Sequence, residues 1–267
     1  MLRARKRLGQ HFLHDPAVID RLVATIAPAP RDNMVEIGGG RGALTLPLLQ
    51  IVETIHVIEL DERMADHLVA LVTEPQRLIM HRGDALKADF SSLASAPGTL
   101  RVVGNLPYNI STPLLFHLLS HRAAIKDMHL MLQKEVATRI AANPGGKDYG
   151  RLTVMLAPWV DVQTCFHIGP GAFSPPPKVW STVIRLTPRT APRFPLEDEA
   201  RFSALVARVF SMRRKTLGRS LTGWLSREQI AAAGIDPGER PERLYPEDFG
   251  RLADLGSDAW GGGREPR

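Results

Sequence analysis

The sequence predicts an α/β fold built on a doubly wound, mostly parallel sheet, followed by a small all-α domain. Between about residue 15 and residue 187, short apolar runs typical of buried strands alternate with helical patterns. Such alternation predicts a parallel sheet covered by helices on both faces. After the proline-rich stretch at 187–195 the strand pattern stops, and residues 196–255 are typical of short helices. We therefore expect one domain at 1–190 and a second at 191–267, which ends in a mobile Gly-rich tail,.

Each expected element has a local reason. The helix at 15–27 has Asp15 as its N-cap and Pro16 at its first helical position, and the helix at 61–72 begins behind Asp61,. Further helices are expected at 43–50, 112–121 and 134–142. Strands are expected, from their apolar and β-branched runs, at 34–38, 54–60, 77–85, 99–105, 127–133, 159–168 and 181–188,. Little besides a Pro-rich loop separates the last two strands, which predicts an antiparallel end to the sheet.

The bulk composition excludes some classes of protein and favours one kind of partner. The 267 residues include 34 Lys and Arg against 28 Asp and Glu, which favours anionic partners, nucleic acid first, although many basic proteins have none,. The single cysteine, Cys165, makes neither an internal disulfide nor a cysteine-based metal site and suits a reducing cytosol,. No run of about 18 apolar residues occurs, so we expect no membrane span,.

A glycine-rich turn, VEIGGGRGALT, follows the first strand of the predicted sheet. Gly38 and Gly40 allow a sharp turn of the backbone and a close approach by a ligand,. Glu59 follows Gly38 by 21 residues and ends the next strand, where a carboxylate can bind both hydroxyls of a ribose,. The pattern indicates a nucleoside-containing cofactor without naming it, since Gly38, Gly40 and Ala43 also fit a dinucleotide site. A glycine turn without a ligand, and an ordinary carboxylate at a strand end, stay open as alternatives.

Asp84, in HRGDALKADF, follows the third strand. At the carboxyl edge of an open α/β sheet, its carboxylate can accept a hydrogen bond from the exocyclic amine of an adenine. It fits equally well as the N-cap of the next helix. The motif alone does not decide between the two roles.

The stretch GNLPYNIS places an amide, a proline and an aromatic ring side by side at a strand end. Methylation of an aromatic amine uses all three, because the nitrogen lone pair is delocalised into the ring and the amine is a poor nucleophile. The side-chain carbonyl of Asn105 and the backbone carbonyl of Leu106 can accept the two amine hydrogens. Pro107 stiffens the turn, and Tyr108 offers a face on which a flipped-out base stacks. With a sulfonium methyl as the electrophile no metal is needed, and we predict none.

These motifs, in this order, resemble those of adenine-N6 methyltransferases that use S-adenosylmethionine. With GQHFL before them and FSPPPKVWSTVIRL after them, the chain resembles the ribosomal RNA adenine N6,N6-dimethyltransferases, the small-subunit (16S rRNA) type most of all, from about Arg3 to Asp254. The resemblance implies a Rossmann-like class I methyltransferase fold, S-adenosyl-L-methionine as cofactor, and dimethylation of two adjacent adenosines in a hairpin near the 3′ end of 16S rRNA. It also implies a monomeric cytoplasmic enzyme of small-subunit biogenesis that acts on the RNA or on a pre-30S particle.

The resemblance also assigns roles to individual residues. Gln10, His11 and Leu13 match an N-terminal motif that closes over the methionine end of the cofactor, although many members have asparagine in place of His11. The cofactor residues that it implies besides these are Gly38, Gly40, Glu59, Asp84, Ala85 and Asn105. Asn105, Leu106, Pro107 and Tyr108 match the catalytic turn, and Phe173 matches an aromatic residue that sandwiches the target base with Tyr108. Without the resemblance, the sequence favours a buried loop aromatic at Phe173.

A basic stretch, RFSALVARVFSMRRKTLGRSL, lies in the expected helical domain. Its apolar residues have helical spacing, so we predict a helix that buries one stripe and offers basic residues to RNA phosphates,. The residues expected to bind RNA are Arg213, Arg214, Lys215 and Arg219. A merely solvated basic face fits the same pattern, while the resemblance implies a small helical domain that helps to hold the ribosomal RNA.

Three other functions stay open at this point. A large-subunit (23S) rRNA adenine methyltransferase of the antibiotic-resistance type shares the fold, cofactor and chemistry. A nicotinamide-dependent oxidoreductase shares the glycine turn but leaves NLPY unexplained. A ribosome-assembly factor without catalysis has no need of Asn105 and Glu59.

Overall fold

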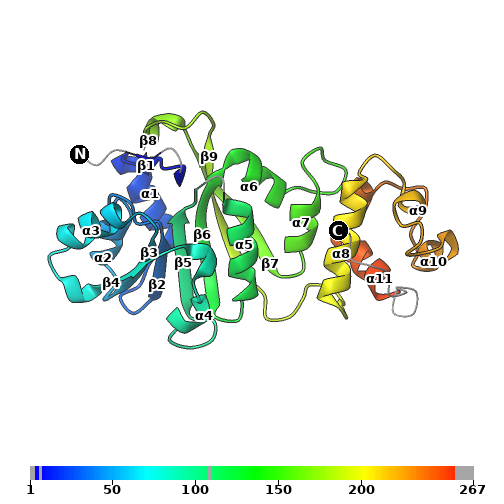
Figure 1. Ribbon diagram of the computed structural model, residues 1–267, viewed down its shortest axis with the longest axis horizontal. Helices are drawn as coiled ribbons and strands as arrows, with labels where there is room; N and C mark the ends of the chain where they lie inside the picture. Colours follow the sequence, from blue (N-terminus) through cyan, green and yellow to red (C-terminus); the bar gives the residue numbers. More distant parts are fainter. Residues whose placement is uncertain (1–3, 6–7, 108–109, 256–267) are drawn as a thin grey trace. The chain divides into compact units, whose positions relative to one another are not determined.

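A computed structural model of the chain describes residues 4–5, 8–107 and 110–255 (Figure 1). Within these residues, a seven-stranded sheet has the strand order β4-β3-β2-β5-β6-β9-β7, and β1 pairs with β8 in a separate two-stranded sheet. The strands are β1 Phe12–Leu13, β2 Asn33–Ile37, β3 Ile55–Glu59, β4 Leu78–Arg82, β5 Leu100–Asn105, β6 Ile125–Gln133, β7 Val160–Ile168, β8 Phe173–Ser174 and β9 Ser181–Pro188. The Gly-rich tail lies outside the described residues.

The described chain divides into two compact units. The first runs as far as Ala137 and resumes over Asp161–Thr190, and the second takes Thr138–Val160 and the described residues from Ala191 onward. The division therefore differs from the sequence expectation by one segment, Thr138–Val160, which groups with the helical unit. Tyr149 explains why, because its buried hydroxyl donates a hydrogen bond of 2.7 Å to the carbonyl of Leu244.

The large sheet is parallel over its first five strands. The register pairs β2 with β3 and β5, β3 with β4, and β5 with β6 in parallel, whereas β9 runs antiparallel to β6 from Met128↔Leu186 to Gln133↔Ser181. The mostly parallel, doubly wound sheet and its antiparallel end are thus confirmed. The sequence pattern did not predict that β9 would lie between β6 and β7.

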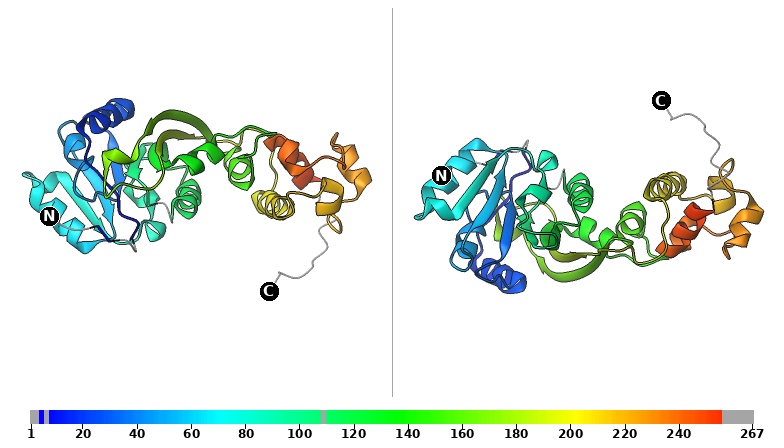
Figure 2. Two further views of the ribbon diagram at one scale, coloured as in Figure 1. Left: turned by 90° about the horizontal axis from the view of Figure 1, so that it is seen from above. Right: turned by 90° about the horizontal axis from the view of Figure 1, so that it is seen from below.

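Helices cover both faces of this sheet. In the first unit they are α1 Pro16–Ile26, α2 Thr45–Leu49, α3 Glu62–Leu71, α4 Phe90–Leu93 and α5 Ser111–Ser120, and α6 Lys134–Ile140 leads into the second unit. Figure 2 shows α1 and α5 on opposite faces of the sheet. As predicted, α1 begins behind Asp15, whose carboxylate accepts hydrogen bonds from the backbone N–H groups of Ala17 and Val18.

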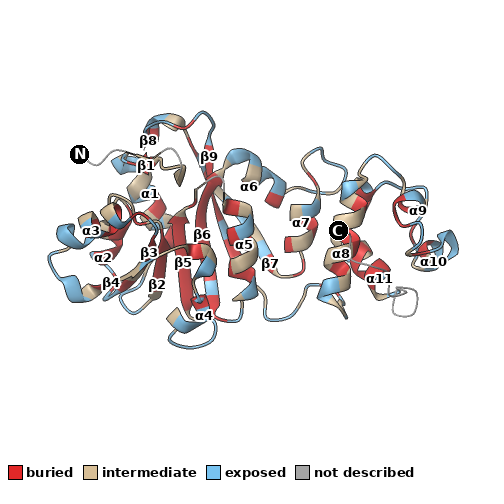
Figure 3. Ribbon diagram, viewed as in Figure 1, coloured by how far each residue is buried: buried red, intermediate tan, exposed pale blue. Residues whose placement is uncertain are grey.

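One apolar core of the first unit lies on the face that α1 covers. Leu22 and Ile26 of α1 and Leu48 of α2 pack with Val103 of β5 in one cluster of buried side chains. Val102 points to the other face because successive strand residues alternate. The central strands β2, β5 and β6 are therefore buried along most of their length (Figure 3), which holds their carboxyl ends in place.

The second unit is helical within the described ranges, apart from the start of β7. Its helices are α7 Arg151–Leu156, α8 Glu199–Ser211, α9 Leu217–Ser220, α10 Arg227–Ala232 and α11 Pro246–Asp254. Its core joins Tyr149 and Val154 to Phe202, Leu205 and Phe249. In the described part of the chain no helix is long and apolar enough to cross a membrane.

The sequence-based prediction of a single basic helix is wrong. Helix α8 ends at Ser211, and Arg213, Arg214 and Lys215 lie in the connection before α9. Tertiary hydrogen bonds separate the two helices, because the backbone N–H groups of Leu217 and Gly218 donate to the carbonyls of Glu239 and Pro237 at 2.8 and 2.9 Å. Helical spacing of apolar residues does not reveal such bonds to a distant segment.

Candidate active site

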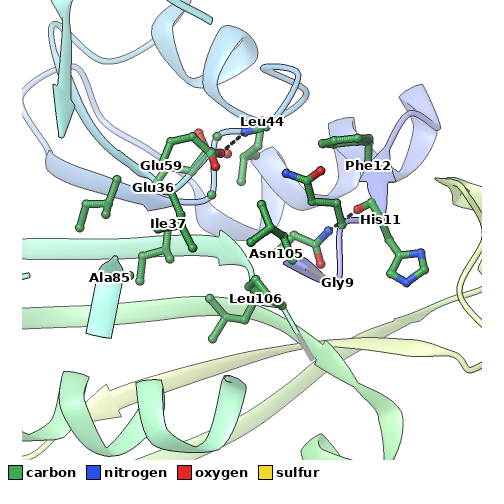
Figure 4. A pocket seen from close by; sticks show the side chains of 18 of the residues that line it. Gly9, His11, Phe12, Glu36, Ile37, Leu44, Glu59, Ala85, Asn105 and Leu106 are labelled. Atoms are coloured by element: carbon green, nitrogen blue, oxygen red, sulfur yellow. Dashed lines mark hydrogen bonds between the residues drawn. The ribbon is translucent and has the colours of Figure 1, made fainter. Parts of the chain in front are cut away.

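A pocket opens at the carboxyl ends of β2, β3, β4 and β5 (Figure 4). The chain runs from β2 outward to β3 and β4 on one side and then returns to β5 and β6 on the other. Ligands of open α/β sheets bind at such a reversal of strand order. The residues predicted from the sequence that line the pocket are Gln10, His11, Leu13 (on β1), Gly38, Gly40, Glu59, Asp84, Ala85, Asn105, Leu106 and Pro107. Tyr108 lies outside the described residues.

The glycine turn needs glycine for two reasons at Gly40. Its φ of +52° lies in the left-handed region, and an added Cβ would come within 3.2 Å of the Phe12 ring,. Phe12 belongs to the N-terminal segment, and the Arg41 guanidinium lies 4.4 Å from the centre of its ring,. The turn therefore shapes the floor of the pocket and packs against the N-terminal segment at once.

Glu59 is anchored by backbone donors. Its two carboxylate oxygens accept hydrogen bonds from the N–H groups of Gly40 at 3.0 Å and of Asp61 at 2.9 Å. Burial raises the pKa of the Glu59 carboxyl, and these two N–H donors oppose the rise. The predicted juxtaposition of Glu59 with the glycine turn is confirmed as geometry.

Asp84 caps the turn that follows β4. Its Oδ1 accepts a hydrogen bond of 3.0 Å from the backbone N–H of Leu86, at the start of the 3₁₀ turn Ala85–Lys87. Asp84 also lines the pocket. The capping role is thus present, and it leaves Oδ2 as a second carboxylate oxygen for a ligand.

Asn105 is oriented by the N-terminal segment. Its Nδ2 donates a hydrogen bond of 2.9 Å to the backbone carbonyl of His11, and Figure 4 shows the two residues side by side in the pocket. Because a carbonyl only accepts hydrogen bonds, the Asn105 atom that faces it is the amide nitrogen. The other polar atom of the Asn105 amide is therefore its oxygen, which accepts hydrogen bonds. The following turn is tied to β6, since Leu106 N–H donates to the Met131 carbonyl at 3.1 Å.

The side chain of Gln10 holds the N-terminal segment in place. Its Oε1 accepts from the backbone N–H of Arg5 at 2.8 Å, and its Nε2 donates to Asp61 at 3.2 Å. The hydrogen bonds of Arg63 to the Asp61 carboxylate are the main reason that the pKa of Asp61 is lowered, so Asp61 is an anionic anchor for this segment. The His11 ring lies on the opposite side, with Nδ1 2.8 Å from the Pro175 carbonyl.

The structure does not support the stacking role predicted for Phe173. Its side chain is 2% exposed, belongs to the same apolar cluster as Leu13, and is absent from the pocket lining. Strand β8 pairs Phe173 with Leu13, and this pairing draws the ring into the core. In this conformation Phe173 is the buried loop aromatic that the sequence alone favoured.

One pocket residue was missed in the sequence. Glu36 is 3% exposed, lines the pocket and accepts a hydrogen bond from the Thr45 hydroxyl. Burial above all, together with the nearby Glu59 carboxylate, raises its pKa to about 8 against the opposing effect of the Thr45 hydrogen bond. An acid flanked by apolar residues near the end of a buried strand was the available signal, since carboxyls with perturbed pKa values cluster at functional sites,.

Acidic groups therefore dominate the charge of the pocket. Glu36, Glu59 and Asp84 line it, and Glu36 and Glu59 form no ion pair with any residue in the described ranges. A buried carboxylate without a cation is costly. The donor and acceptor set thus suits a ligand that carries hydroxyls and positive charge.

The predicted RNA residues lie in the second unit. Arg214, Lys215 and Arg219 are exposed, whereas Arg213 is half-buried and its Nε lies 2.9 Å from the Glu242 carboxylate. Arg213 also donates to the Lys147 carbonyl at 2.9 Å. Arg213 thus has partners within its own unit, and the other three present their charge to solvent.

Comparison with known proteins identifies the family. The family model described as "Ribosomal RNA adenine dimethylase" matches residues 1–256. The chain is 50% identical, over 96% of its length and 95% of the relative, to ribosomal RNA small subunit methyltransferase A of Pseudomonas fluorescens. It is 52% identical to the protein of that name from Nitrosococcus oceani, over 92% of the chain and 94% of the relative.

Solved structures agree with this assignment. A dimethyladenosine transferase from Plasmodium falciparum matches with a TM-score of 0.73 and 28% identity over 91% of this chain and 96% of the other. The 23S rRNA methyltransferase ErmE matches with a TM-score of 0.71 and 26% identity over 92% of this chain and 99% of the other. Both resemble the chain over nearly its whole length. With its glycine turn, its strand-end carboxylates and Asn105 at the switch point of a class I methyltransferase sheet, the chain belongs to the ribosomal RNA adenine dimethylase family.

Proposed function

We propose that the chain dimethylates the N6 amines of two adjacent adenosines in a hairpin near the 3′ end of 16S rRNA. As a member of its family it is a methyltransferase, and S-adenosyl-L-methionine is its cofactor. The observation that carries the proposal is the pocket at the switch point, where Asn105 lies at the end of β5 opposite two buried carboxylates. The names of relatives about half identical to the chain favour the small ribosomal subunit.

The cofactor, when bound, supplies an activated methyl on a sulfonium. We assign the Glu59 carboxylate to the two ribose hydroxyls, because it ends β3 beside the glycine turn and is held by two backbone donors,. Asp84 and the Ala85 backbone border the adenine, and Gln10, His11 and Leu13 close the methionine end. Glu36 adds a second buried carboxylate, which a cationic ligand stabilises in its charged form,.

The chain's own groups at the reacting amine are acceptors. The Asn105 amide nitrogen is bonded to the His11 carbonyl, so the amide oxygen is the atom available to an N6 hydrogen of the target adenine. The backbone carbonyl of Leu106 takes the other hydrogen, with Pro107 stiffening the turn and Tyr108 offering its ring to the base. Two acceptors favour a pyramidal nitrogen whose lone pair points at the methyl, and alignment then supplies much of the rate.

RNA binding also needs residues outside the pocket. Exposed Arg214, Lys215 and Arg219 of the helical unit are suited to phosphates, whose recognition carries little sequence information,. We further propose that the protein acts in the cytoplasm, as a monomer, on the RNA or on a pre-30S particle. A role in small-subunit biogenesis follows from that substrate.

The test is methyl transfer followed by mapping. Small-subunit rRNA that lacks N6,N6-dimethyladenosine is incubated with labelled cofactor and the protein, and the methylated adenosines are located by mass spectrometry. The expected result is two adjacent dimethylated adenosines near the 3′ end, which the Asn105→Ala variant should form far more slowly. A label that appears only in large-subunit rRNA would overturn the proposed substrate.

A second substrate has one observation in its favour. The fold of ErmE, a 23S rRNA methyltransferase, matches the chain almost as well as the dimethyladenosine transferase does, with TM-scores of 0.71 and 0.73. Large-subunit rRNA is therefore included as a competing substrate in the same reaction. Fold alone does not choose between them, because the two structures share fold and chemistry.

A further inference from the structure

An exposed indole lies outside the pocket. Trp180 is 53% exposed and Val179 is 43% exposed, although both come from an apolar stretch next to buried β9. Exposed apolar and aromatic side chains that lie together commonly mark a surface on which a partner binds. The mechanism proposed above uses neither residue.

Topology places Trp180 at the same edge of the sheet as the pocket. Residue Ser181 pairs with Gln133, the last residue of β6, and β6 runs parallel to β5, which ends at Asn105. Parallel neighbours have their carboxyl ends at one edge, so Trp180 leaves the sheet at the edge where Asn105 lies. The same loop also reaches the pocket wall, since the Pro175 carbonyl lies 2.8 Å from Nδ1 of His11.

The backbone around Trp180 is held firmly. Its carbonyl accepts a hydrogen bond of 2.8 Å from the N–H of Lys134 at the start of α6. Nearby, Nδ1 of His167 lies 2.8 Å from the Thr182 hydroxyl and ties the end of β7 to β9. The indole itself lies near the bare backbone of Gly169, where an added Cβ would be 3.9 Å from the ring. An aromatic side chain on a fixed backbone loses little conformational freedom when it binds a partner.

The neighbourhood suits a nucleobase. Lys178, two residues before Trp180, is exposed and forms no ion pair with any residue that the structure describes, so it adds positive charge next to the ring. Every nucleobase has a flat face that stacks on an aromatic ring, and a nearby cation attracts the phosphate that joins two bases. The target adenine must arrive at this edge, together with the nucleotides on either side of it.

We propose that Trp180 stacks on a nucleobase of the RNA substrate outside the pocket, next to the adenine that enters it. The inference rests on the proposed function, because it takes an RNA methylated at this edge as the partner. It adds an RNA contact in the first unit that is separate from Tyr108 and from the basic residues of the helical unit. Trp180 acts on substrate binding and not on the transfer of the methyl.

The test compares three variants in steady-state kinetics with the RNA substrate that the wild type methylates. Trp180→Ala is expected to raise the KM for RNA about 5- to 100-fold, the loss measured for one base–aromatic stack. The turnover number at saturating RNA and the affinity for S-adenosylmethionine should stay within about twofold. Trp180→Phe keeps a ring and should recover most of the affinity. Leu71→Ala is the matched control, since Leu71 is 42% exposed at the end of α3, where the chain returns to the amino edge of the sheet.

Fluorescence gives a readout that does not depend on the Ala variant being folded. Stacking of a base on Trp180 should quench part of the tryptophan emission of the wild type when RNA is added, and Trp180→Phe should lack that part. An unchanged KM in folded Trp180→Ala, or equal quenching in wild type and Trp180→Phe, would overturn the inference. A blue shift without quenching would also overturn it, because it indicates that the indole becomes buried without stacking on a base. The proposed function fails separately, if the wild type transfers no methyl to small-subunit RNA.

Discussion

The two edges of the large sheet bury charge in opposite ways. At the amino edge, Arg101 is 6% exposed and bonds Asp127 with Nε at 2.9 Å and Nη2 at 3.0 Å, while its Nη1 lies 2.6 Å from Asp32. At the carboxyl edge, the carboxylates of Glu36 and Glu59 are also buried, but neither has a cationic partner among the described residues. The charges at the amino edge compensate one another within the fold, whereas the two acidic side chains at the carboxyl edge have no cation and can take a ligand as their partner.

At the amino edge, Arg101 also forms hydrogen bonds with backbone carbonyls. Besides its two carboxylates, Arg101 donates to the carbonyls of Ile26 at 2.6 Å and Ala27 at 3.2 Å, and so satisfies the C-terminal end of α1. No comparable donors surround Glu36 in the described part of the chain, where its hydrogen bond comes from the Thr45 hydroxyl. We therefore expect substitutions at the amino edge to change stability and those at the carboxyl edge to change binding or catalysis.

The largest effect is expected from breaking the network at the amino edge. Arg101→Ala removes the main cationic partner of the buried Asp127 carboxylate and leaves it a longer contact of 3.4 Å with the Arg185 guanidinium, which should lower the free energy of unfolding by about 3–5 kcal/mol,. Urea unfolding followed by circular dichroism measures this. Turnover per folded molecule should stay near the wild-type value, and a large loss of turnover in the folded fraction would show that the two edges are coupled.

At the carboxyl edge, Asn105→Ala should lower the turnover number by about 10²- to 10³-fold, because an oriented acceptor at the reacting amine is lost. Stability should change by much less than for Arg101→Ala. Single-turnover methyl transfer at saturating cofactor and RNA isolates the step. A turnover number within about tenfold of the wild type would remove the amide from the mechanism.

Acidity should affect two buried groups of the sheet, Glu36 and His129, with opposite sign. Burial raises the pKa of Glu36 to about 8, so the folded protein holds a proton that the unfolded chain releases, and stability falls as the pH rises from about 4.5 to about 8,. Burial lowers the pKa of His129 to about 4, so the unfolded chain gains a proton first, and stability falls as the pH drops from about 6.5 to about 4,.

Glu36→Gln removes the first of these effects. In the protein without cofactor, the variant should be stabilised relative to wild type by about 1–3 kcal/mol more at pH 8 than at pH 5. Urea unfolding at the two pH values provides the comparison. An equal difference at both would show that Glu36 is ionised throughout and contradict its raised pKa.

The smallest effect concerns the helical unit. Arg214 and Lys215 are exposed, so changing both to Ala should flatten the slope of log RNA affinity against log salt by about 0.7–0.9 per lost phosphate contact,. Arg213 is the matched control, because its ion pair with Glu242 occupies it within the unit. Titrations at three salt concentrations measure the slope, and an unchanged slope in the folded double variant would exclude these residues from RNA binding.

Local chemistry made much of the site predictable. The capping residue Asp15, the glycine turn and the 21-residue spacing to Glu59 are set by neighbours in the chain or by the regular geometry of a βαβ unit,. The parallel sheet then brings the glycine turn and Glu59 to the same edge. The carboxyl-edge position of Asn105 follows in the same way from the end of β5.

Contacts between distant segments could not be predicted from the sequence. The pairing of β1 with β8 buries Phe173, and hydrogen bonds from Leu217 and Gly218 to the 237–239 segment end the basic helix early. The pairing of Asn105 with the His11 carbonyl joins residues 94 apart in the chain. No periodicity or spacing encodes such pairs, since they depend on how the loops close around the finished sheet.

The central claim is that the unpaired carboxylates at the carboxyl edge belong to a cofactor. Calorimetric titration of S-adenosylmethionine into wild type, Glu59→Ala and Asp32→Asn tests it most directly. The account predicts that Glu59→Ala weakens binding by about 1–3 kcal/mol, the value of charge-assisted hydrogen bonds to the ribose. Asp32→Asn, which weakens the paired network at the other edge, should bind as the wild type does once folded. Unchanged affinity in Glu59→Ala, or equal losses in both variants, would contradict the account.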